Sequence, residues 1–195
     1  FDSKKDFQKY PRDLNNDINL LKKKKVDYLY IPNDKNIYSF KSKKSIYLDK
    51  FSKKLCGKYR RGHFKAVVNV VNRFLEIIKP RTIYLGMKDF QQLSLIRLHI
   101  NKKKIKTKLI SCPTIRAANG LALSSRNARL SNSHIQKAGN IYNYLKKNKK
   151  FILNKILKKK KIEIIKKLIG LGAEKIDYIE CLNLKKLEFC KNQQW

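Results

Sequence analysis

The chain has no long hydrophobic run and no signal-like start, which narrows where it can act. It is 195 residues long, and no stretch approaches the roughly 18 consecutive apolar residues that a membrane-spanning helix needs. Its first residues also lack the charged and apolar regions of a secretory leader. The sequence therefore predicts a soluble, cytoplasmic protein that does not act at a membrane.

Cysteines are few and far apart. The four are Cys56, Cys112, Cys181 and Cys190, and no two of them are separated by only two or three residues. Zinc sites and dithiol motifs use such close pairs. We therefore expect neither, and in a reducing compartment we expect unpaired thiols.

Acidic residues are scarce, with 14 against 48 basic residues and a formal net charge of +34. Such a charge attracts nucleic acid, anionic membranes or phosphorylated ligands. However, lysine supplies 39 of the basic residues, and the runs Lys22–Lys25, Lys102–Lys104 and Lys158–Lys161 lie beside apolar segments. A nucleic-acid groove combines basic residues with aromatic platforms. The sequence favours a solvated basic surface, and a nucleic-acid-binding module stays as an alternative.

Apolar periodicity predicts an α/β fold. The pattern gives a helix over 64–78, a strand over 82–85, a second helix from Asp89 and a strand over 107–110. Helices and strands that alternate at this spacing favour a parallel sheet, in which ligands bind outside the carboxyl ends of the strands. The segment Gly86–Gln92 occupies such a position.

The flanking segments carry weaker patterns. They predict helices over 13–25, 131–147 and 151–168 and strands over 26–32 and 176–182. After Pro113 the alternating helix and strand patterns give way to a polar segment. This change predicts two domains, residues 1–114 and a smaller domain over 115–195.

Two polar segments could carry chemistry. In the first, Gly86 allows a ligand to approach the backbone, Lys88 can neutralise phosphate oxygens, and Asp89 can either cap the following helix or bind a ribose hydroxyl. The second, Gly120–Asn127, places two hydroxyls beside Arg126, a combination that suits a triphosphate. Alternatively, these are an ordinary N-cap with a surface cation and an ordinary serine-rich loop.

Together these segments resemble the pantothenate synthetase (pantoate–β-alanine ligase) family, and the resemblance covers essentially the whole chain. The matching motifs occur in the family's order: Tyr10-Pro11-Arg12, Val26-Asp27, Arg60 with Gly62-His63-Phe64, Lys88–Leu93, Leu123–Asn127 and Asp177–Glu180.

The resemblance implies a Rossmann-like parallel sheet of the nucleotidyltransferase superfamily with a smaller α+β C-terminal domain. It implies an ATP-dependent condensation of pantoate with β-alanine through a pantoyl-adenylate. It further implies a homodimer that uses ATP and Mg²⁺, with no protein side chain assigned to the metal.

The resemblance also implies site residues. Lys88, Ser124, Ser125 and Arg126 would be catalytic, and Arg60 and His63 would lie near the site. Gln92, Val70 and Val71 would bind pantoate. The ATP site would comprise Gly86, Met87, Lys88, Asp89, Ile115, Leu123, Ser124, Ser125 and Arg126.

Some positions depart from the family pattern. Met87 replaces a usual glutamate and Arg61 a usual proline, but neither change removes a ligand group assigned above. The paired-histidine motif expected before Phe1 and the closing strands expected after Trp195 are not in the sequence, so we expect these 195 residues alone to be inactive. Another adenylate-forming nucleotidyltransferase remains an alternative, although Gln92 argues against it.

Overall fold

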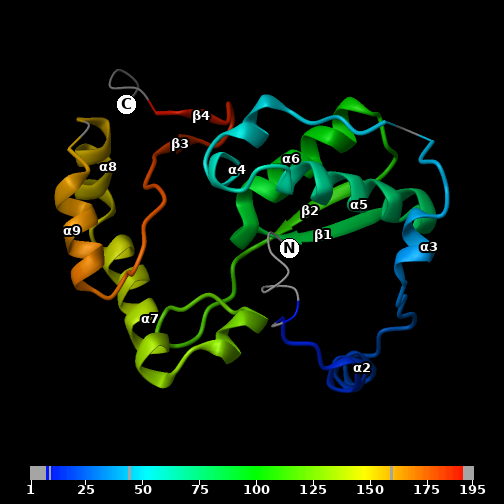
Figure 1. Ribbon diagram of the computed structural model, residues 1–195, viewed down its shortest axis with the longest axis horizontal. Coiled ribbons are helices and arrows are strands. Elements are labelled where there is room, and N and C mark those ends of the chain that lie inside the picture. Colours follow the sequence, from blue (N-terminus) through cyan, green and yellow to red (C-terminus); the bar gives the residue numbers. More distant parts are fainter. Residues whose placement is uncertain (1–7, 9, 44, 159, 191–195) are drawn as a thin grey trace. The chain divides into compact units, whose positions relative to one another are not determined.

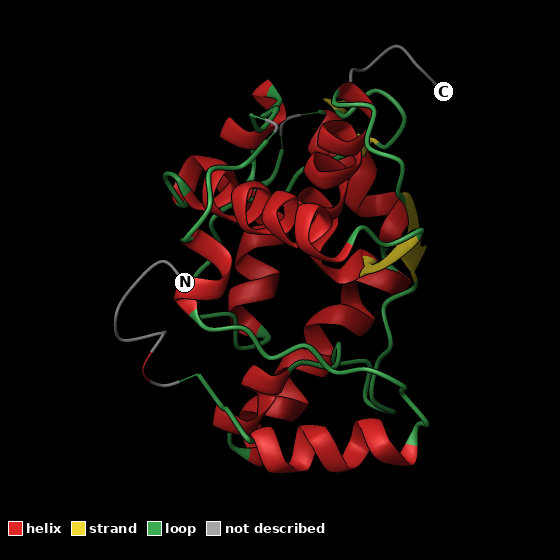
Figure 2. Ribbon diagram, turned by 90° about the vertical axis from the view of Figure 1, so that its right-hand side faces the viewer, coloured by secondary structure: helices red, strands yellow, loops and turns green. Residues whose placement is uncertain are grey.

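The computed structural model describes residues 8, 10–43, 45–158 and 160–190, and helices account for most of its regular structure (Figure 2). Contacts divide the chain into two compact units, Phe1–Cys112 and Pro113–Trp195. The division falls after Cys112, whereas the sequence placed it after Thr114.

A parallel strand pair forms the centre of the first unit (Figure 1). Strand β1 (Thr82–Gly86) pairs with β2 (Lys108–Cys112), so that Thr82 lies opposite Lys108 and Gly86 opposite Cys112. Helix α6 (Phe90–Lys102) connects the two strands. The predicted α/β class and the parallel pairing are confirmed.

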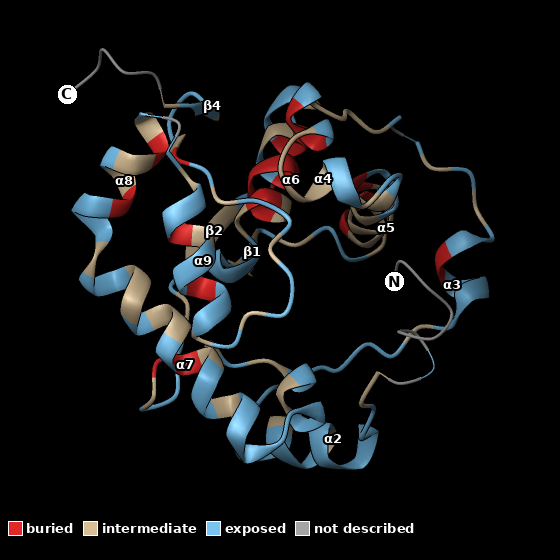
Figure 3. Ribbon diagram, turned by 60° about the vertical axis from the view of Figure 1, so that its left-hand side comes forward, coloured by how far each residue is buried: buried red, intermediate tan, exposed pale blue. Residues whose placement is uncertain are grey.

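The core of the first unit lies between α5 (His63–Ile78) and α6. Both helices place apolar residues at helical spacing, which gives each a face to bury. Figure 3 shows the buried positions concentrated on these helices. The buried side chains include Phe64, Val68 and Leu75 of α5 and Leu93, Leu95, Ile96 and Ile100 of α6.

The connection before α5 is anchored by polar contacts. It contains α3 (Asp34–Tyr38), η1 (Lys50–Lys53) and α4 (Cys56–Tyr59). Arg73 of α5 donates from Nη1 to the carbonyl oxygens of Ile37 and Phe40, at 3.0 and 2.8 Å. These bonds hold the end of α3 against α5.

The predicted helix at the start of the chain is present, but the strand after it is not. Helix α2 (Leu14–Lys23) is capped by the Asp13 carboxylate, which accepts from the Asn16 N–H. Residues 26–32 form neither helix nor strand, and Tyr28 is 93% exposed. The β-branched and aromatic pattern was sufficient to predict a strand, but no described segment pairs with it.

The second unit is built from helices and one short hairpin. Helix α7 (Asn132–Lys147) follows the 3₁₀ helix η3 (Ser125–Arg129). The single helix predicted over 151–168 is wrong, because α8 (Lys149–Leu157) ends before the lysine run and α9 (Ile162–Gly170) begins after it. The predicted continuous helix is therefore two helices separated at the lysine run.

The C-terminal hairpin differs from the predicted strand over 176–182. Strand β3 (Leu182–Asn183) pairs antiparallel with β4 (Glu188–Phe189). The unit's core lies between this segment and the two preceding helices, and its buried members are Ile152, Ile156, Ile164, Leu168 and Cys181.

A disulfide joins Cys181 to Cys190 at the base of this hairpin. The expectation of unpaired thiols is therefore wrong for these two residues, and it holds for Cys56 and Cys112. A turn brings together two cysteines that are nine residues apart, which no short-range motif reveals. None of the described helices is both long and apolar enough to cross a membrane.

Candidate active site

The first predicted segment forms the turn between β1 and α6. Gly86 ends the strand, Met87–Asp89 make the 3₁₀ helix η2, and α6 starts at Phe90. A side chain on Gly86 would meet open space. This backbone can therefore be approached by a ligand at the carboxyl end of β1.

The polar side chains of this turn face solvent. Lys88 Nζ lies 3.5 Å from Asp89 Oδ1, with the two side chains 41% and 62% exposed. Asp89 occupies the N-cap position of α6, yet its carboxylate accepts no cap hydrogen bond. The simple capping alternative is not realised, which leaves the Asp89 oxygens available to a ligand.

The second predicted segment lies in the second unit and folds back on itself. The Leu123 N–H donates to the Ile115 carbonyl at 3.0 Å, so these two exposed apolar residues are neighbours. Ser124 caps η3, its hydroxyl accepting from the Arg126 N–H at 3.3 Å. The structure thus brings Ile115 to the loop of Leu123–Arg126.

A glycine and helix α7 hold this loop in place. Gly120 has a φ of +93°, and a Cβ there would lie 2.7 Å from a Tyr142 ring carbon. The Arg116 guanidinium stacks 3.6 Å from the centroid of the same ring, and its Nη1 donates to the Gly120 carbonyl at 3.1 Å. The turn that precedes the serines therefore requires glycine.

The first unit has a cavity of about 600 Å³ beside the N-terminal half of α5. It brings together three of the predicted residues, Arg60, His63 and Val70, and Val71 is not among its lining residues. Tyr38 and Tyr59 also line it. The sequence analysis missed both tyrosines, although Tyr59 directly precedes Arg60.

The two adjacent glutamines of α6 differ in environment. Gln92 is half-buried, while Gln91 is 7% exposed and donates from Nε2 to the carbonyls of Phe51 and Lys54, at 2.8 and 2.7 Å. Gln91 thereby fixes η1 to α6. This structural role gave no signal in the sequence, because its partners are backbone atoms.

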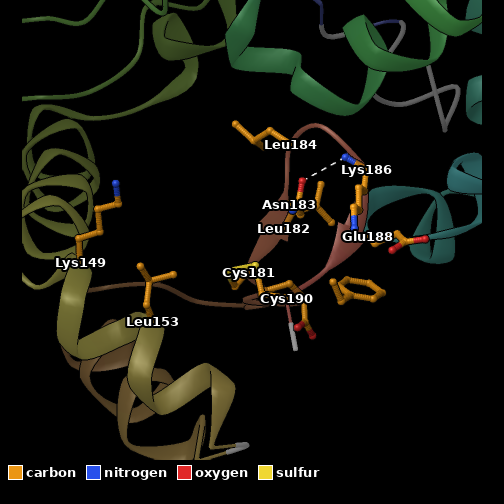
Figure 4. Close-up of a pocket in the computed structure, with 11 residues that line it drawn as sticks. Lys149, Leu153, Cys181, Leu182, Asn183, Leu184, Lys186, Glu188 and Cys190 are labelled. Atoms are coloured by element: carbon orange, nitrogen blue, oxygen red, sulfur yellow. Dashed lines mark hydrogen bonds between the residues drawn. A yellow bond between two sulfur atoms is a disulfide. The ribbon is translucent and has the colours of Figure 1, made fainter. Parts of the chain in front are cut away.

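Another cavity, of about 560 Å³, lies in the second unit beside the hairpin (Figure 4). Lys149 and Leu153 approach it from α8, and the Cys181–Cys190 disulfide lies at the base of the hairpin. None of the predicted site residues lines it.

The fold and the site define a class: a parallel α/β protein with an exposed turn of glycine, lysine and aspartate at the carboxyl end of a strand. Comparisons with known proteins give the family within it. A family profile described as pantoate-beta-alanine ligase matches residues 1–194. This chain belongs to the pantoate–β-alanine ligase family, whose members form a carbon–nitrogen bond.

Individual relatives support the same family. The chain is 37% identical over 190 residues to the pantothenate synthetase of Thermotoga petrophila, covering 96% of this chain and 68% of that protein. It is 36% identical to the pantothenate synthetase of Flavobacterium psychrophilum, covering 99% of this chain and 69% of the relative.

Solved structures show the same fold. The Francisella tularensis pantoate–β-alanine ligase, complexed with β-γ ATP and β-alanine, superposes with a TM-score of 0.78 at 38% identity, over 94% of this chain and 67% of the other. The Thermus thermophilus pantothenate synthetase superposes with a TM-score of 0.82 at 28% identity, over 95% of this chain and 68% of the other. The nucleotidyltransferase-type fold is confirmed, and the alternative of a nucleic-acid-binding module is not favoured.

Proposed function

We propose that this chain binds ATP and pantoate, forms a pantoyl-adenylate, and transfers the pantoyl group to β-alanine to give pantothenate. The observation that carries this proposal is the solvent-facing Lys88–Asp89 turn at the carboxyl end of β1, in a chain of the pantoate–β-alanine ligase family. The ligands of the Francisella ligase, β-γ ATP and β-alanine, support the same substrates here.

The residues proposed to bind ATP lie in two segments of the sequence. Lys88 contacts the phosphates and Asp89 the ribose, and the loop of Leu123–Arg126 is the triphosphate-binding lid. The full set is Gly86, Met87, Lys88, Asp89, Ile115, Leu123, Ser124, Ser125 and Arg126.

Pantoate occupies the α5 side of the site. Val70 and Val71 form an apolar wall for its methyl groups, and Gln92 binds its polar end. Arg60 and His63 lie beside Val70 on the cavity described above. This placement supports a role for both residues near the pantoate carboxylate.

The chemistry requires two displacements. A pantoate carboxylate oxygen attacks the α-phosphorus of ATP, and the bond to the bridging oxygen breaks as pyrophosphate leaves. The β-alanine amine then attacks the acyl carbon, loses a proton, and displaces AMP. The Lys88 ammonium and the Arg126 guanidinium offset the negative charge that grows on the phosphates, so catalysis is positioning plus electrostatics.

A magnesium ion would contribute further neutralisation of phosphate charge when bound. Mg²⁺ prefers oxygen ligands and is commonly shared between one or two carboxylates, phosphates and water. Asp89 is the carboxylate of the turn, and no group of three or more acidic, histidine or cysteine residues in the described part of the chain could hold a metal. The residues present fit an ion carried by the phosphates of ATP, and no side chain of this chain is assigned to it.

Two further properties follow from the family resemblance. We propose that the enzyme works as a homodimer in the cytoplasm. Sedimentation would test the first property and fractionation of cells the second.

The test of the function is a coupled pair of assays, run on this chain fused to the parts of a relative that the chain does not span. ATP and pantoate should release pyrophosphate, and hydroxylamine should trap a pantoyl hydroxamate, while β-alanine should give pantothenate by mass spectrometry. Lys88→Gln and Arg126→Gln should each lower pyrophosphate release about 100-fold or more, whereas the matched change Lys146→Gln on α7 should have no effect. Pyrophosphate release that does not depend on pantoate would reject the proposal.

A further inference from the structure

A separate cavity of about 560 Å³ lies at the other end of the β1–β2 pair. It is lined by the C-terminal part of α5, by residues 104–106 after α6, and by Phe40 and Lys43. Because α5 and α6 lead into β1 and β2, their C-terminal ends lie at the amino ends of these strands. The Gly86–Asp89 turn follows the carboxyl end of β1, so this cavity is distinct from the proposed active site.

The floor of this cavity is apolar. Leu75 is 5% exposed, and the half-buried side chains of Phe40, Ile77 and Ile105 also line the cavity. Pockets of about 300 to 1,000 Å³ with apolar walls and a few polar groups are typical of sites for small organic ligands.

The rim of the cavity is cationic. Four exposed lysines lie on it, Lys43, Lys79, Lys104 and Lys106. No ion pair with a carboxylate of the described residues involves any of the four. Their positive charge is therefore available to a ligand.

The one carboxylate in the lining, Glu76, is directed toward the protein's own donors. Its Oε1 accepts from the Ser42 hydroxyl at 2.8 Å and from Asn72 Nδ2 at 3.2 Å. Its Oε2 accepts from the Lys43 N–H at 3.2 Å. Glu76 is therefore satisfied by donors of the protein, and its single negative charge is outnumbered by the four lysines of the rim.

Two of the rim lysines have left-handed backbone. Lys79 has a φ of 49° and Lys104 a φ of 50°, and each follows a helix that ends at this cavity. Glycine or asparagine is the usual residue at such a position, since a side chain there is strained. Lys79 and Lys104 thus lie at two neighbouring helix ends beside the cavity.

We propose that this cavity binds a small amphipathic organic anion. A straight-chain carboxylate of about ten carbons matches its size and lining. The chain would lie on Leu75 and Ile105, and the carboxylate would lie among the ammonium groups of Lys79, Lys104 and Lys106. Burying the chain removes apolar surface from water, and the lysines attract the headgroup without having to be desolvated completely.

The test compares three ligands that share one apolar body. Decanoate, decanol and decyltrimethylammonium, each below its micellar concentration, compete for binding with the fluorescent anion 1-anilinonaphthalene-8-sulfonate. Decanoate should displace the probe about tenfold more effectively than decanol, and the cation least, because only decanoate carries the charge that the lysines attract. Equal displacement by all three ligands would overturn the proposal.

Substitutions in the lining test whether decanoate binds in this cavity. The double change Lys79→Gln and Lys106→Gln should weaken decanoate binding about fivefold or more and leave decanol unchanged, and filling the cavity with Ile105→Trp should abolish both. Lys146→Gln with Lys147→Gln, on exposed α7, makes the same change in net charge elsewhere. Equal weakening by this control pair would show that the effect is only general electrostatics, and the proposal would fail.

Discussion

Gln91 and Gln92 are adjacent in α6, but their side chains have different environments and different roles. Gln91 is buried and bonded to two backbone carbonyls, whereas Gln92 is half-buried and is proposed to bind pantoate. Because the two side chains are identical, the same substitution at each position compares the two environments directly.

We predict that Gln92→Leu raises the KM for pantoate about tenfold or more, because a lost hydrogen bond to a polar substrate group is costly. The free energy of unfolding should not change. Gln91→Leu should instead lower the free energy of unfolding by about 1 to 3 kcal/mol, since two hydrogen bonds are lost, although the Phe51 and Lys54 carbonyls each keep one backbone donor. Steady-state kinetics and urea denaturation separate the two effects, and the reverse assignment would contradict the proposed site.

The fold shifts the acid–base chemistry of Tyr47. Its hydroxyl donates to Asp49 Oδ2 at 3.0 Å, and this hydrogen bond, with burial and the carboxylate charge adding to it, raises the pKa of Tyr47 above its ordinary value of 10.0. The folded protein therefore holds this proton more tightly than the unfolded chain. The resulting stability is fully present below pH 10.0 and is lost as the pH rises through the folded pKa.

We predict that Asp49→Asn brings the ionisation of Tyr47 back toward pH 10, because the main cause of the shift is removed while the amide oxygen can still accept from the Phe51 N–H. The difference in phenolate absorbance between each protein and its Tyr47→Phe derivative measures this residue alone. Superimposable difference titrations for the two proteins would refute the prediction.

At the scale of elements, a buried polar chain connects α5 and α6. His99 and Asn72 are both 0% exposed, and His99 Nε2 lies 2.9 Å from Asn72 Oδ1. The Tyr47 N–H donates to His99 Nδ1 at 3.0 Å, so the neutral ring carries its proton on Nε2 and donates it to Asn72. The chain fixes the register of the two helices that carry Val70 and Gln92.

We predict that His99→Leu destabilises the fold by about 2 to 4 kcal/mol, because Asn72 Oδ1 and the Tyr47 N–H each lose a buried partner. Adding Asn72→Ala should cost less than the sum of the two single changes, with a coupling of about 1 to 3 kcal/mol. Urea denaturation of the unchanged protein, the two single variants and the double variant measures this coupling. Strict additivity would mean that the two side chains do not interact.

The sequence predicted best those helices and strands whose own spacing of apolar residues marks the face that they bury. The helix over 64–78 and both parallel strands were found because each displays its own apolar face. Residues 26–32 were mispredicted because a strand also needs a partner, and a pattern within one segment does not reveal one. The lysine run at 158–161 was predicted to be part of a helix, whereas α8 ends at Leu157 and α9 begins at Ile162.

The local geometry of the candidate site was predictable to a similar degree. Lys88 and Ser124 lie in compact motifs, and the turn containing Lys88 has the predicted strand-to-helix geometry. The sequence did not reveal Tyr38, whose place on the cavity depends on how α3 packs against α5. The Cys181–Cys190 bond was missed for the same reason, since a hairpin brings the two residues together.

At the scale of the whole molecule, the charge of +34 is a source of self-repulsion. Raising the ionic strength from about 0.01 to about 0.15 M shortens the screening length from about 30 to about 8 Å. We predict that the Tm rises by about 3 to 8 °C over this range, as repulsion within the folded state is screened. Sodium chloride and sodium gluconate should act alike, and a Tm that falls or stays constant in both salts would contradict the prediction.

The covalent link at the base of the β3–β4 hairpin has a practical consequence. The exposed Lys185 and Lys186 lie inside the loop that the Cys181–Cys190 bond closes. A tryptic digest run without reducing agent should therefore contain one disulfide-linked peptide that carries both cysteines, and mass spectrometry of the same digest after reduction should find the two peptides separately.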